Sequence, residues 1–258
     1  MLGLAGRLLT NAKLYGEDPY FAIVEEDGRV VAAALRTPPH NLILSETDAP
    51  ARYVALAEDA RAAFHSLPGV VGPAAAIEAF VSAWTSLTGD SARLVMSERI
   101  YEATEVIAPR RVDGRMRPVT EQDHDLVLGW VDAFMLEALP FLPADARGFL
   151  ERRAADPAAG LVVWDDGAPV SIAGYGGPTP HGIRIGPVYT PPELRGGGYA
   201  SALVAELTQE LLSNGRDFCF LFTDLANATS NSIYQRVGYR PVTDVEQLMF
   251  ERVARRVG

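Results

Sequence analysis

Two stretches of the chain, about 140 residues apart, carry the same succession of strand and turn signals. The stretch AIVEEDGRVVAAALRTPPHNLILS (residues 22–45) and the stretch LVVWDDGAPVSIAGYGGPTPHGIRIG (residues 161–186) each run from an apolar strand into an acidic turn that ends in glycine. Each continues with a second strand, a Pro-His turn and a third strand. The offset is 139 for the glycines (167 − 28) and 141 for the histidines (181 − 40), so the register drifts by two residues. Matching turns in the same order favour an internal duplication.

A duplication divides the chain of 258 residues into two similar α+β domains. The charged segment APRRVDGRMRPVTEQD (residues 108–123), which contains proline and glycine, separates them, and we predict a boundary near Gly114, between domains 1–114 and 115–258. The patterns of the second domain predict strands at 116–120, 161–164, 169–175, 183–189, 218–225 and 247–251, helices up to about residue 155, a helix that begins at Tyr199 and stops at Asn214-Gly215, and a short helix that Gly238 closes.

Composition narrows the function classes. A hydrophobic content of 48% with 22% charged residues is typical of a folded globular chain. The net charge of −10 argues against nonspecific nucleic-acid binding, which needs clustered basic residues. The one cysteine, Cys219, excludes an internal disulfide, and the four histidines are scattered, so we expect no metal site. No segment has the roughly 20 apolar residues that span a bilayer, and the N-terminus is a poor signal peptide, so we expect a cytoplasmic protein that binds no membrane.

Three consecutive glycines stand between the third strand of the second stretch and the predicted helix, in TPPELRGGGYASALVAEL (residues 190–207). Each glycine loses more chain entropy on ordering than alanine, at a cost of about 0.5 to 1 kcal/mol. An ordered run of three glycines therefore requires a favourable contribution to the free energy that offsets this cost. A helix N-terminus exposes unpaired N–H groups that bind oxyanions, and Arg195 adds a full charge. A pyrophosphate would use all of these groups. A Walker loop is excluded because this stretch contains no lysine. A dinucleotide-binding fold is excluded because its glycines follow the first strand of a parallel unit, whereas these follow hairpins late in the chain.

Two motifs together resemble one family. Arg195-x-x-Gly198-x-Ala200, after the strand PVYT, resembles the acyl-CoA pyrophosphate loop of the GCN5-related N-acetyltransferase (GNAT) family. The segment NATSNSIYQRVGY, with Asn227, Tyr234 and the pair Gly238-Tyr239, resembles a late segment of the same family. The motifs stand in the family's order and separation, and the resemblance covers residues 114–251. It implies a fold of two tandem GNAT-like domains, each a mixed, mostly antiparallel sheet flanked by helices.

The resemblance also implies a reaction and a set of roles. An amine attacks acetyl-CoA, the co-substrate, directly in a ternary complex, and backbone N–H groups near the end of the third strand stabilise the oxyanion. Tyr234 matches the residue that stabilises or protonates the departing thiolate. The residues expected to bind the cofactor are Val188, Tyr189, Thr190, Arg195, Gly196, Gly197, Gly198, Tyr199, Ala200 and Asn227. No base is identifiable; Glu137, Glu193 and Asp224 are candidates, and a water chain is an alternative.

The first half lacks the glycines, and acidic Glu46 and Asp48 stand where phosphates would bind. Like charges repel, so we predict that residues 1–114 form a degenerate copy without the acyl-CoA loop. The expected function is N-acetyl transfer to the amine of a small molecule or peptide, by a monomer or homodimer without nucleic-acid partners. Two alternatives stay open: a noncatalytic acyl-CoA-binding protein, and a tandem acetyltransferase with two working sites.

Overall fold

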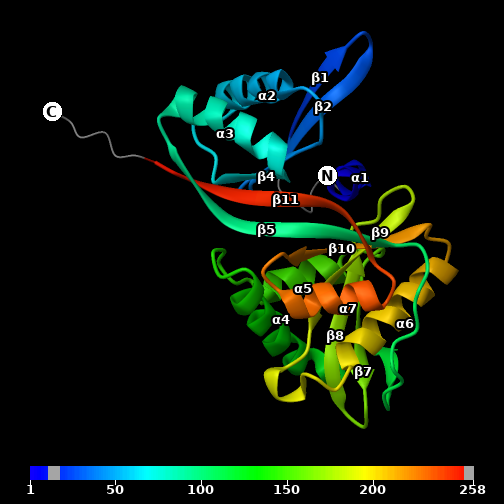
Figure 1. Ribbon diagram of the computed structural model, residues 1–258. Coiled ribbons are helices and arrows are strands. Elements are labelled where there is room, and N and C mark those ends of the chain that lie inside the picture. The colour runs from blue at the N-terminus through cyan, green and yellow to red at the C-terminus, as the bar shows by residue number, and fades with distance from the viewer. Residues whose placement is uncertain (11–17, 253–258) are drawn as a thin grey trace. The chain divides into compact units, whose positions relative to one another are not determined.

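The computed structural model describes residues 1–10 and 18–252 (Figure 1). Contacts divide the chain into two compact units. Unit 1 consists of Met1–Glu98 and Thr243–Gly258, and unit 2 of Arg99–Val242. Both units combine a mixed sheet with helices, which confirms the predicted α+β class.

Unit 1 is built on strands in the order β1-β2-β3-β4-β11-β5. Its elements are α1 (Leu2–Thr10), β1 (Tyr20–Glu26), β2 (Arg29–Arg36), β3 (Leu42–Leu44), α2 (Pro50–Ala63), β4 (Gly69–Pro73), α3 (Ala74–Thr88) and parts of β5 (Ser91–Ala103) and β11 (Arg240–Glu251). Strands β1, β2 and β3 pair in antiparallel fashion, β3 and β4 run parallel, and β11 pairs antiparallel with β4. Helices α2 and α3 pack their apolar faces, which include the fully buried Leu56, Phe80 and Trp84, on this sheet.

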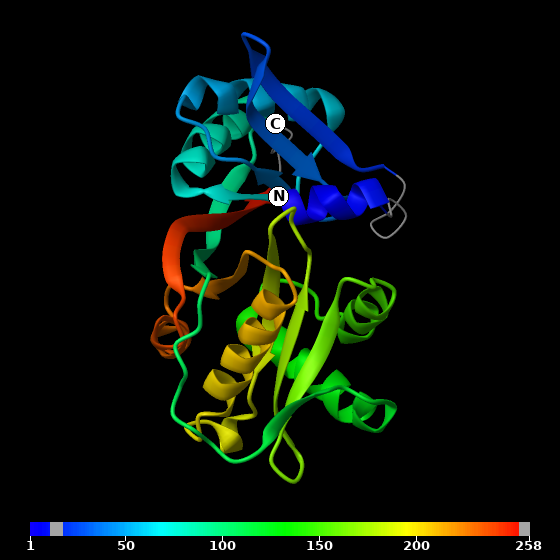
Figure 2. The ribbon, with the colours of Figure 1, turned by 90° about the vertical axis from the view of Figure 1, so that its right-hand side faces the viewer.

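Unit 2 repeats this pattern in the order β5-β10-β9-β8-β7-β6. Its elements are β6 (Arg115–Pro118), the short 3-10 turn η2 (Glu121–Asp123), α4 (His124–Ala138), α5 (Ala146–Ala154), β7 (Gly160–Asp165), β8 (Pro169–Gly176), β9 (Gly182–Tyr189), η3 (Pro192–Leu194), α6 (Tyr199–Ser213), β10 (Phe218–Asp224) and α7 (Ala228–Arg236). All pairings from β6 to β9 are antiparallel, whereas β9 and β10 run parallel. Helices α4 and α5 cover one face of the sheet and α6 the other (Figure 2).

The same succession of elements occurs twice along the chain. β1, β2, β3, α2, β4, α3 and β5 correspond in order and type to β7, β8, β9, α6, β10, α7 and β11. Both predicted hairpins are present, and their turns contain Gly28 and Gly167 with φ of 73° and 78°. Positive φ is the conformation that glycine adopts without a steric penalty, which explains why both turns end in this residue.

The two units differ in extent from the domains predicted with a boundary near Gly114. Strand β5 begins in unit 1 and ends in unit 2, and β11 crosses in the opposite direction. The final strand also starts at Arg240 rather than near Gln247. Since each of these long strands has residues in both units, no single cut point separates the units. The assignment of residues 1–114 as a degenerate copy and 115–258 as the active one stays a prediction.

The predicted core of unit 2 is confirmed in its main features. Helix α6 buries Leu203, Val204, Leu207 and Leu211 against the sheet, and Leu212 lies half-buried beside them. Cys219 is fully buried on β10, and burial raises the pKa of its thiol to about 12. It is therefore a core residue without an accessible thiolate. Helix α6 ends at Ser213, followed by Gly215 with a φ of 90°, as the Asn-Gly stop signal predicts.

Candidate functional site

Strands β9 and β10 separate towards the end of β9. Their parallel pairing joins Gly182 to Phe218, Ile183 to Cys219 and Arg184 to Phe220. β9 then continues for five residues, Ile185 to Tyr189, beyond this pairing. On its other side β9 stays paired with β8, with an irregular register opposite Gly186. The predicted residues Val188 and Tyr189 therefore lie on a strand that keeps one neighbour and leaves the other.

The side chains at the end of β9 point to opposite faces of the sheet. Val188 packs against the cluster that contains α6 and α7, whereas Tyr189 is buried among residues of α4 and α5. Thr190 is fixed by Ser171 on β8, whose hydroxyl lies 2.9 Å from Thr190 Oγ1 and donates to the carbonyl of Tyr189 at 3.1 Å. The end of β9 is thus held by β8 on one side, beside the place where it has separated from β10.

The glycine turn follows directly and leads into α6. Gly196 and Gly198 have φ of 84° and 89°, and Gly198 is the N-cap residue of the helix. A Cβ atom at Gly196 would meet nothing within 4 Å, so this part of the turn is open, whereas one at Gly198 would lie 3.1 Å from Val112. No side chain caps the helix, so its first amides, from Tyr199 to Ser201, are not bonded within it. The turn therefore presents N–H donors and the positive end of the helix dipole together.

Arg195 lies at the mouth of this turn and is already held by the protein. Its Nε donates to the carbonyl of Thr190 at 2.9 Å, and its Nη2 donates to Glu137 Oε2 at 2.7 Å. Glu137 comes from the end of α4 and also accepts a weak hydrogen bond from Tyr189 at 3.4 Å. The sequence suggested Glu137 as a base, but the pattern gave no sign of this pairing, which depends on the packing of α4 against β9.

Tyr199 and Asn227 use their side chains for local structure. The Tyr199 hydroxyl donates to Asp166 in the β7–β8 turn at 3.1 Å, and this hydrogen bond is the main reason why the pKa of Tyr199 is raised. Asn227 is the N-cap of α7, since its Oδ1 accepts from the Ser230 amide at 3.0 Å. Ala200 lies half-buried in the first turn of α6.

Tyr234 lies on α7 with its ring inside the core. It is 8% exposed and its ring meets that of Tyr239 edge-on, with centroids 6.0 Å apart. Burial raises the pKa of Tyr234 to about 12, so the hydroxyl stays protonated at neutral pH. Within the described residues the hydroxyl has no hydrogen-bond partner. The hydroxyl of Tyr234 can therefore donate a hydrogen bond to a ligand.

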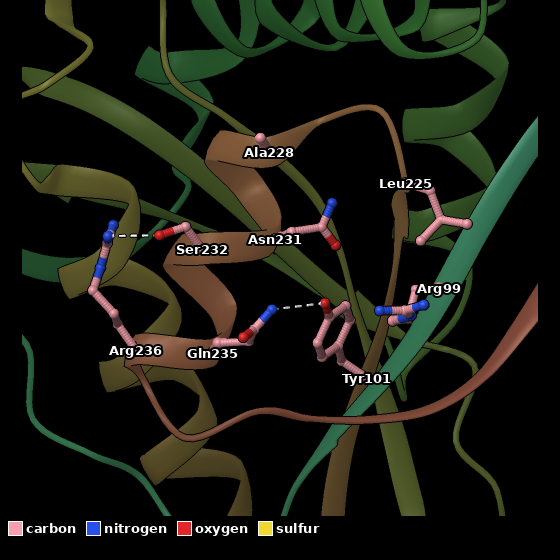
Figure 3. Close-up of a pocket in the computed structure, with 8 residues that line it drawn as sticks. All are labelled: Arg99, Tyr101, Leu225, Ala228, Asn231, Ser232, Gln235 and Arg236. Atoms are coloured by element: carbon pink, nitrogen blue, oxygen red, sulfur yellow. Dashed lines mark hydrogen bonds between the residues drawn. The ribbon is translucent and has the colours of Figure 1, made fainter.

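A pocket of about 430 Å³ lies beside α7, between this helix and the end of β5. Figure 3 shows Gln235 donating to the hydroxyl of Tyr101 and Arg236 donating to Ser232 at its wall. None of the predicted cofactor residues lines this pocket. Tyr234 precedes Gln235 by one residue, a rotation of about 100° around the helix, so it faces elsewhere. The pocket is a separate feature of α7 from the candidate site.

The model of the acetyltransferase (GNAT) family matches residues 126–239, a span that contains β9, the glycine turn and all of α7. This part of the chain is a GNAT acetyltransferase domain. The resemblance that the two motifs indicated is thereby confirmed. No protein of curated function matches the sequence significantly.

Solved structures share the fold over almost the whole chain. A GCN5-related N-acetyltransferase from Kribbella flavida has a TM-score of 0.63 at 15% identity, with 98% of this chain and 96% of that chain covered. A GNAT-family acetyltransferase from Colwellia psychrerythraea has a TM-score of 0.56 at 12% identity, with 95% and 97% covered. A tandem GNAT protein from the clavulanic acid biosynthesis pathway has a TM-score of 0.51 at 14% identity, with 97% and 87% covered. At such identities these similarities establish the fold.

No group of three or more His, Cys, Asp or Glu side chains in residues 1–10 and 18–252 is arranged to hold a metal ion. Within the same residues, no helix has the length and apolar character needed to cross a bilayer.

Proposed function

We propose that unit 2 transfers an acetyl group from acetyl-CoA to the amine of a small molecule or peptide, by direct attack in a ternary complex. Acetyl-CoA supplies an acetyl group activated as a thioester. The observation that carries the proposal is the open glycine turn at the N-terminus of α6, directly after a strand that has separated from its neighbour. We further propose that the protein works in the cytoplasm as a monomer or homodimer.

The turn fits a pyrophosphate in shape and charge. Gly196 leaves its part of the turn open, the absence of a side chain at Gly197 makes room for the ring of Tyr199, and the uncapped start of α6 offers several N–H donors in one direction. Arg195 keeps further N–H donors beyond the two that bond Thr190 and Glu137. Backbone groups of Val188 to Thr190 would bind the chain that links the phosphates to the thioester, and Asn227 would contact it from α7.

We assign Tyr234 the role of donor to the departing sulfur. An alkyl thiol such as cysteine has a pKa of about 8.5, whereas the pKa of Tyr234 is about 12. Full proton transfer from the phenol to such a thiolate would be uphill by roughly 5 kcal/mol. The hydroxyl therefore acts best as a hydrogen-bond donor that stabilises the developing negative charge in a site of low polarity.

The three candidate bases differ in how they are engaged. Glu137 is ion-paired with Arg195 at 2.7 Å, so its carboxylate is already engaged by a side chain of the protein. Asp224 accepts a hydrogen bond from the Ala226 amide at 2.8 Å within its own turn, and Glu193 is exposed. These contacts do not orient any of the three carboxylates towards an attacking amine. We therefore favour a water chain as the route for the amine proton.

A thiol-release assay with a panel of amines tests the proposal. Acetyl-CoA is supplied with amino acids, polyamines, aminoglycosides and peptide N-termini, and free thiol is measured with and without each acceptor. We expect release that depends on one acceptor class and disappears in Tyr234→Phe. Binding of acetyl-CoA without thiol release across the panel would favour the noncatalytic alternative. Release that survives in Gly198→Asp would favour a second working site in unit 1.

A further inference from the structure

Unit 1 contains a pocket of about 340 Å³ that lies away from the segment matching the glycine turn. It is formed at the amino-terminal ends of β3 and β4, by Arg36 at the end of β2, by the loop after α2, by Asp90 and by the end of β11. Ser45–Pro50, the counterpart of the glycine turn, follows the carboxyl end of β3 instead. A volume of this size is at the lower end of the range for small-molecule sites, which is about 300 to 1,000 Å³.

Arg36 is the unusual residue in this pocket. It is only 8% exposed, and its guanidinium lies over the ring of Phe64 at 4.4 Å from the centroid. Its Nε donates to the carbonyl of His40 at 2.9 Å, but neither terminal nitrogen bonds to a residue in the described part of the chain. Burial alone lowers the pKa of this guanidinium, with no contribution from a carboxylate. A buried cation without a counter-charge is costly, and a bound anion would offset that cost.

Asp90 contributes the opposite charge to the same pocket. Its Oδ2 accepts a hydrogen bond from Trp84 Nε1 at 3.3 Å, and its backbone amide donates to Thr88. The described residues supply no cation within ion-pair distance of Asp90, and Arg36 and Asp90 do not pair with each other. The apolar part of the lining comes from Pro39, Leu67, Pro68 and Phe250, and Ser66 and the exposed Arg252 complete it. One pocket thus holds a buried cation, Arg36, and an anion, Asp90, that are not paired with each other, together with an exposed second arginine and an apolar surface.

We propose that this pocket binds a zwitterionic small molecule, an α-amino acid with an apolar side chain. The carboxylate of the ligand meets the guanidinium of Arg36, whose two terminal nitrogens can bind it in bidentate geometry. The ammonium group meets Asp90, and the side chain lies against Phe250 and Leu67. The site involves residues of unit 1 alone and is independent of acetyl transfer in unit 2.

The corresponding loops of unit 2 support this assignment by contrast. There, His181 occupies the place of His40 in the repeat, and its carbonyl accepts from the Asp217 amide at 2.9 Å. Its Nδ1 also lies 3.0 Å from Asp217 Oδ2. The loops before β9 and β10 are thus tied to each other by their own groups. In unit 1 a buried arginine lies at this end of the sheet instead, and its terminal donors are left for a ligand.

Calorimetric titration of the full chain with three related probes tests the proposal. L-phenylalanine carries both charges, 3-phenylpropionate lacks the ammonium group, and phenethylamine lacks the carboxylate. We expect saturable binding of L-phenylalanine and at least about tenfold weaker binding of the other two, since each lacks one charged hydrogen bond. The absence of saturable heat with L-phenylalanine and with L-leucine, or equal binding of 3-phenylpropionate, would overturn the proposal.

Substitutions of Arg36 and Asp90 test which residue binds each charged group of the ligand. Arg36→Met should weaken L-phenylalanine binding by roughly tenfold or more, whereas Arg29→Met, the same change at the exposed start of β2, should leave it unchanged. Asp90→Asn should weaken binding of L-phenylalanine but not of 3-phenylpropionate. Wild-type affinity in Arg36→Met would overturn the proposal. Because Arg36 is buried and its variant could fail to fold, the half-buried Asp90 provides the second test, and wild-type selectivity in Asp90→Asn would also overturn it.

Discussion

The two units repeat one succession of elements yet differ most at the loop after the third strand. In unit 2, β9 has eight residues and leads into an open glycine turn. In unit 1, β3 has three residues, and the loop that follows is closed on its own side chains. The Thr47 amide donates to the Tyr53 hydroxyl at 3.0 Å, and Arg52 bonds Glu26, Thr47 and Asp48. In unit 1 the Thr47 amide of this loop is thus bonded to a tyrosine side chain, and an ion-pair network of Arg52 holds the loop.

The helix after the fourth strand shows a second difference. Tyr234 is the seventh residue of α7, and Phe80 is the seventh residue of α3. Both rings are buried, but phenylalanine has no hydroxyl to donate. The two units thus share a succession of elements, whereas the glycine turn and the tyrosine to which we assign a role in transfer occur in unit 2. Function follows the residues at the site and not the shared architecture.

The largest effect that we expect comes from Gly198→Asp. The substitution forces a left-handed backbone on a residue with a side chain, places Cβ 3.1 Å from Val112 and adds a negative charge at the start of α6. Like charges about 4 Å apart repel by roughly 4 kcal/mol near a protein surface, so acetyl-CoA affinity should fall about a thousandfold. Calorimetric titration measures this. Gly215→Asp, at the other end of α6 with a φ of 90°, is the matched control and should bind normally.

The next largest effect concerns the difference between Tyr234 and Phe80. Tyr234→Phe should lower turnover by about a hundredfold, the usual contribution of one positioned donor, while acetyl-CoA affinity changes little. Steady-state kinetics and equilibrium binding separate the two quantities. Tyr239→Phe removes another buried hydroxyl, which bonds Thr208 at 2.7 Å, and should keep its turnover. Unchanged turnover in Tyr234→Phe would remove this residue from the mechanism.

The arginines of the two loops give a smaller contrast. Arg195→Ala should weaken acetyl-CoA binding by roughly tenfold through loss of one charge-assisted contact to phosphate. Arg52→Ala removes the arginine that bonds Glu26 and Asp48 in unit 1, and should lower the melting temperature without changing acetyl-CoA affinity. Equal effects of the two variants on binding would mean that the loops do not differ in function.

The smallest effect concerns Glu137, which pairs with Arg195. Glu137→Gln removes a negative charge beside the proposed phosphate site, so acetyl-CoA should bind a few times more tightly. Turnover should change little if a water chain carries the amine proton. Binding and kinetics on the same preparation decide this, and a hundredfold loss of turnover would instead identify Glu137 as the base.

Local signals in the sequence predicted most of the local structure. The two glycine turns, the apolar face of α6 and the Asn-Gly stop depend on residues close in the chain, and all are present. The division of β5 and β11 between the two units could not be predicted. Strands that pair across a long sequence separation leave no local pattern in the sequence. Helices α1 and α3 also went unpredicted.

The candidate site was predicted in its residue types but not in its contacts. The glycines and Arg195 stand where the motif places them, at the start of α6. The ion pair of Arg195 with Glu137 spans 58 residues of sequence, and the hydrogen bond of Tyr199 with Asp166 spans 33. The buried position of Arg36 likewise depends on the packing of Phe64 and the loop after β2. Such contacts arise from tertiary packing, which periodicity and spacing do not encode.

The central claim is that one of two related units holds the cofactor. Calorimetric titration of the intact chain with acetyl-CoA tests it most directly, since the stoichiometry is read from the midpoint of the curve. The account predicts one equivalent per chain and no saturable binding in Gly198→Asp. Two equivalents per chain, with one retained in Gly198→Asp, would contradict it.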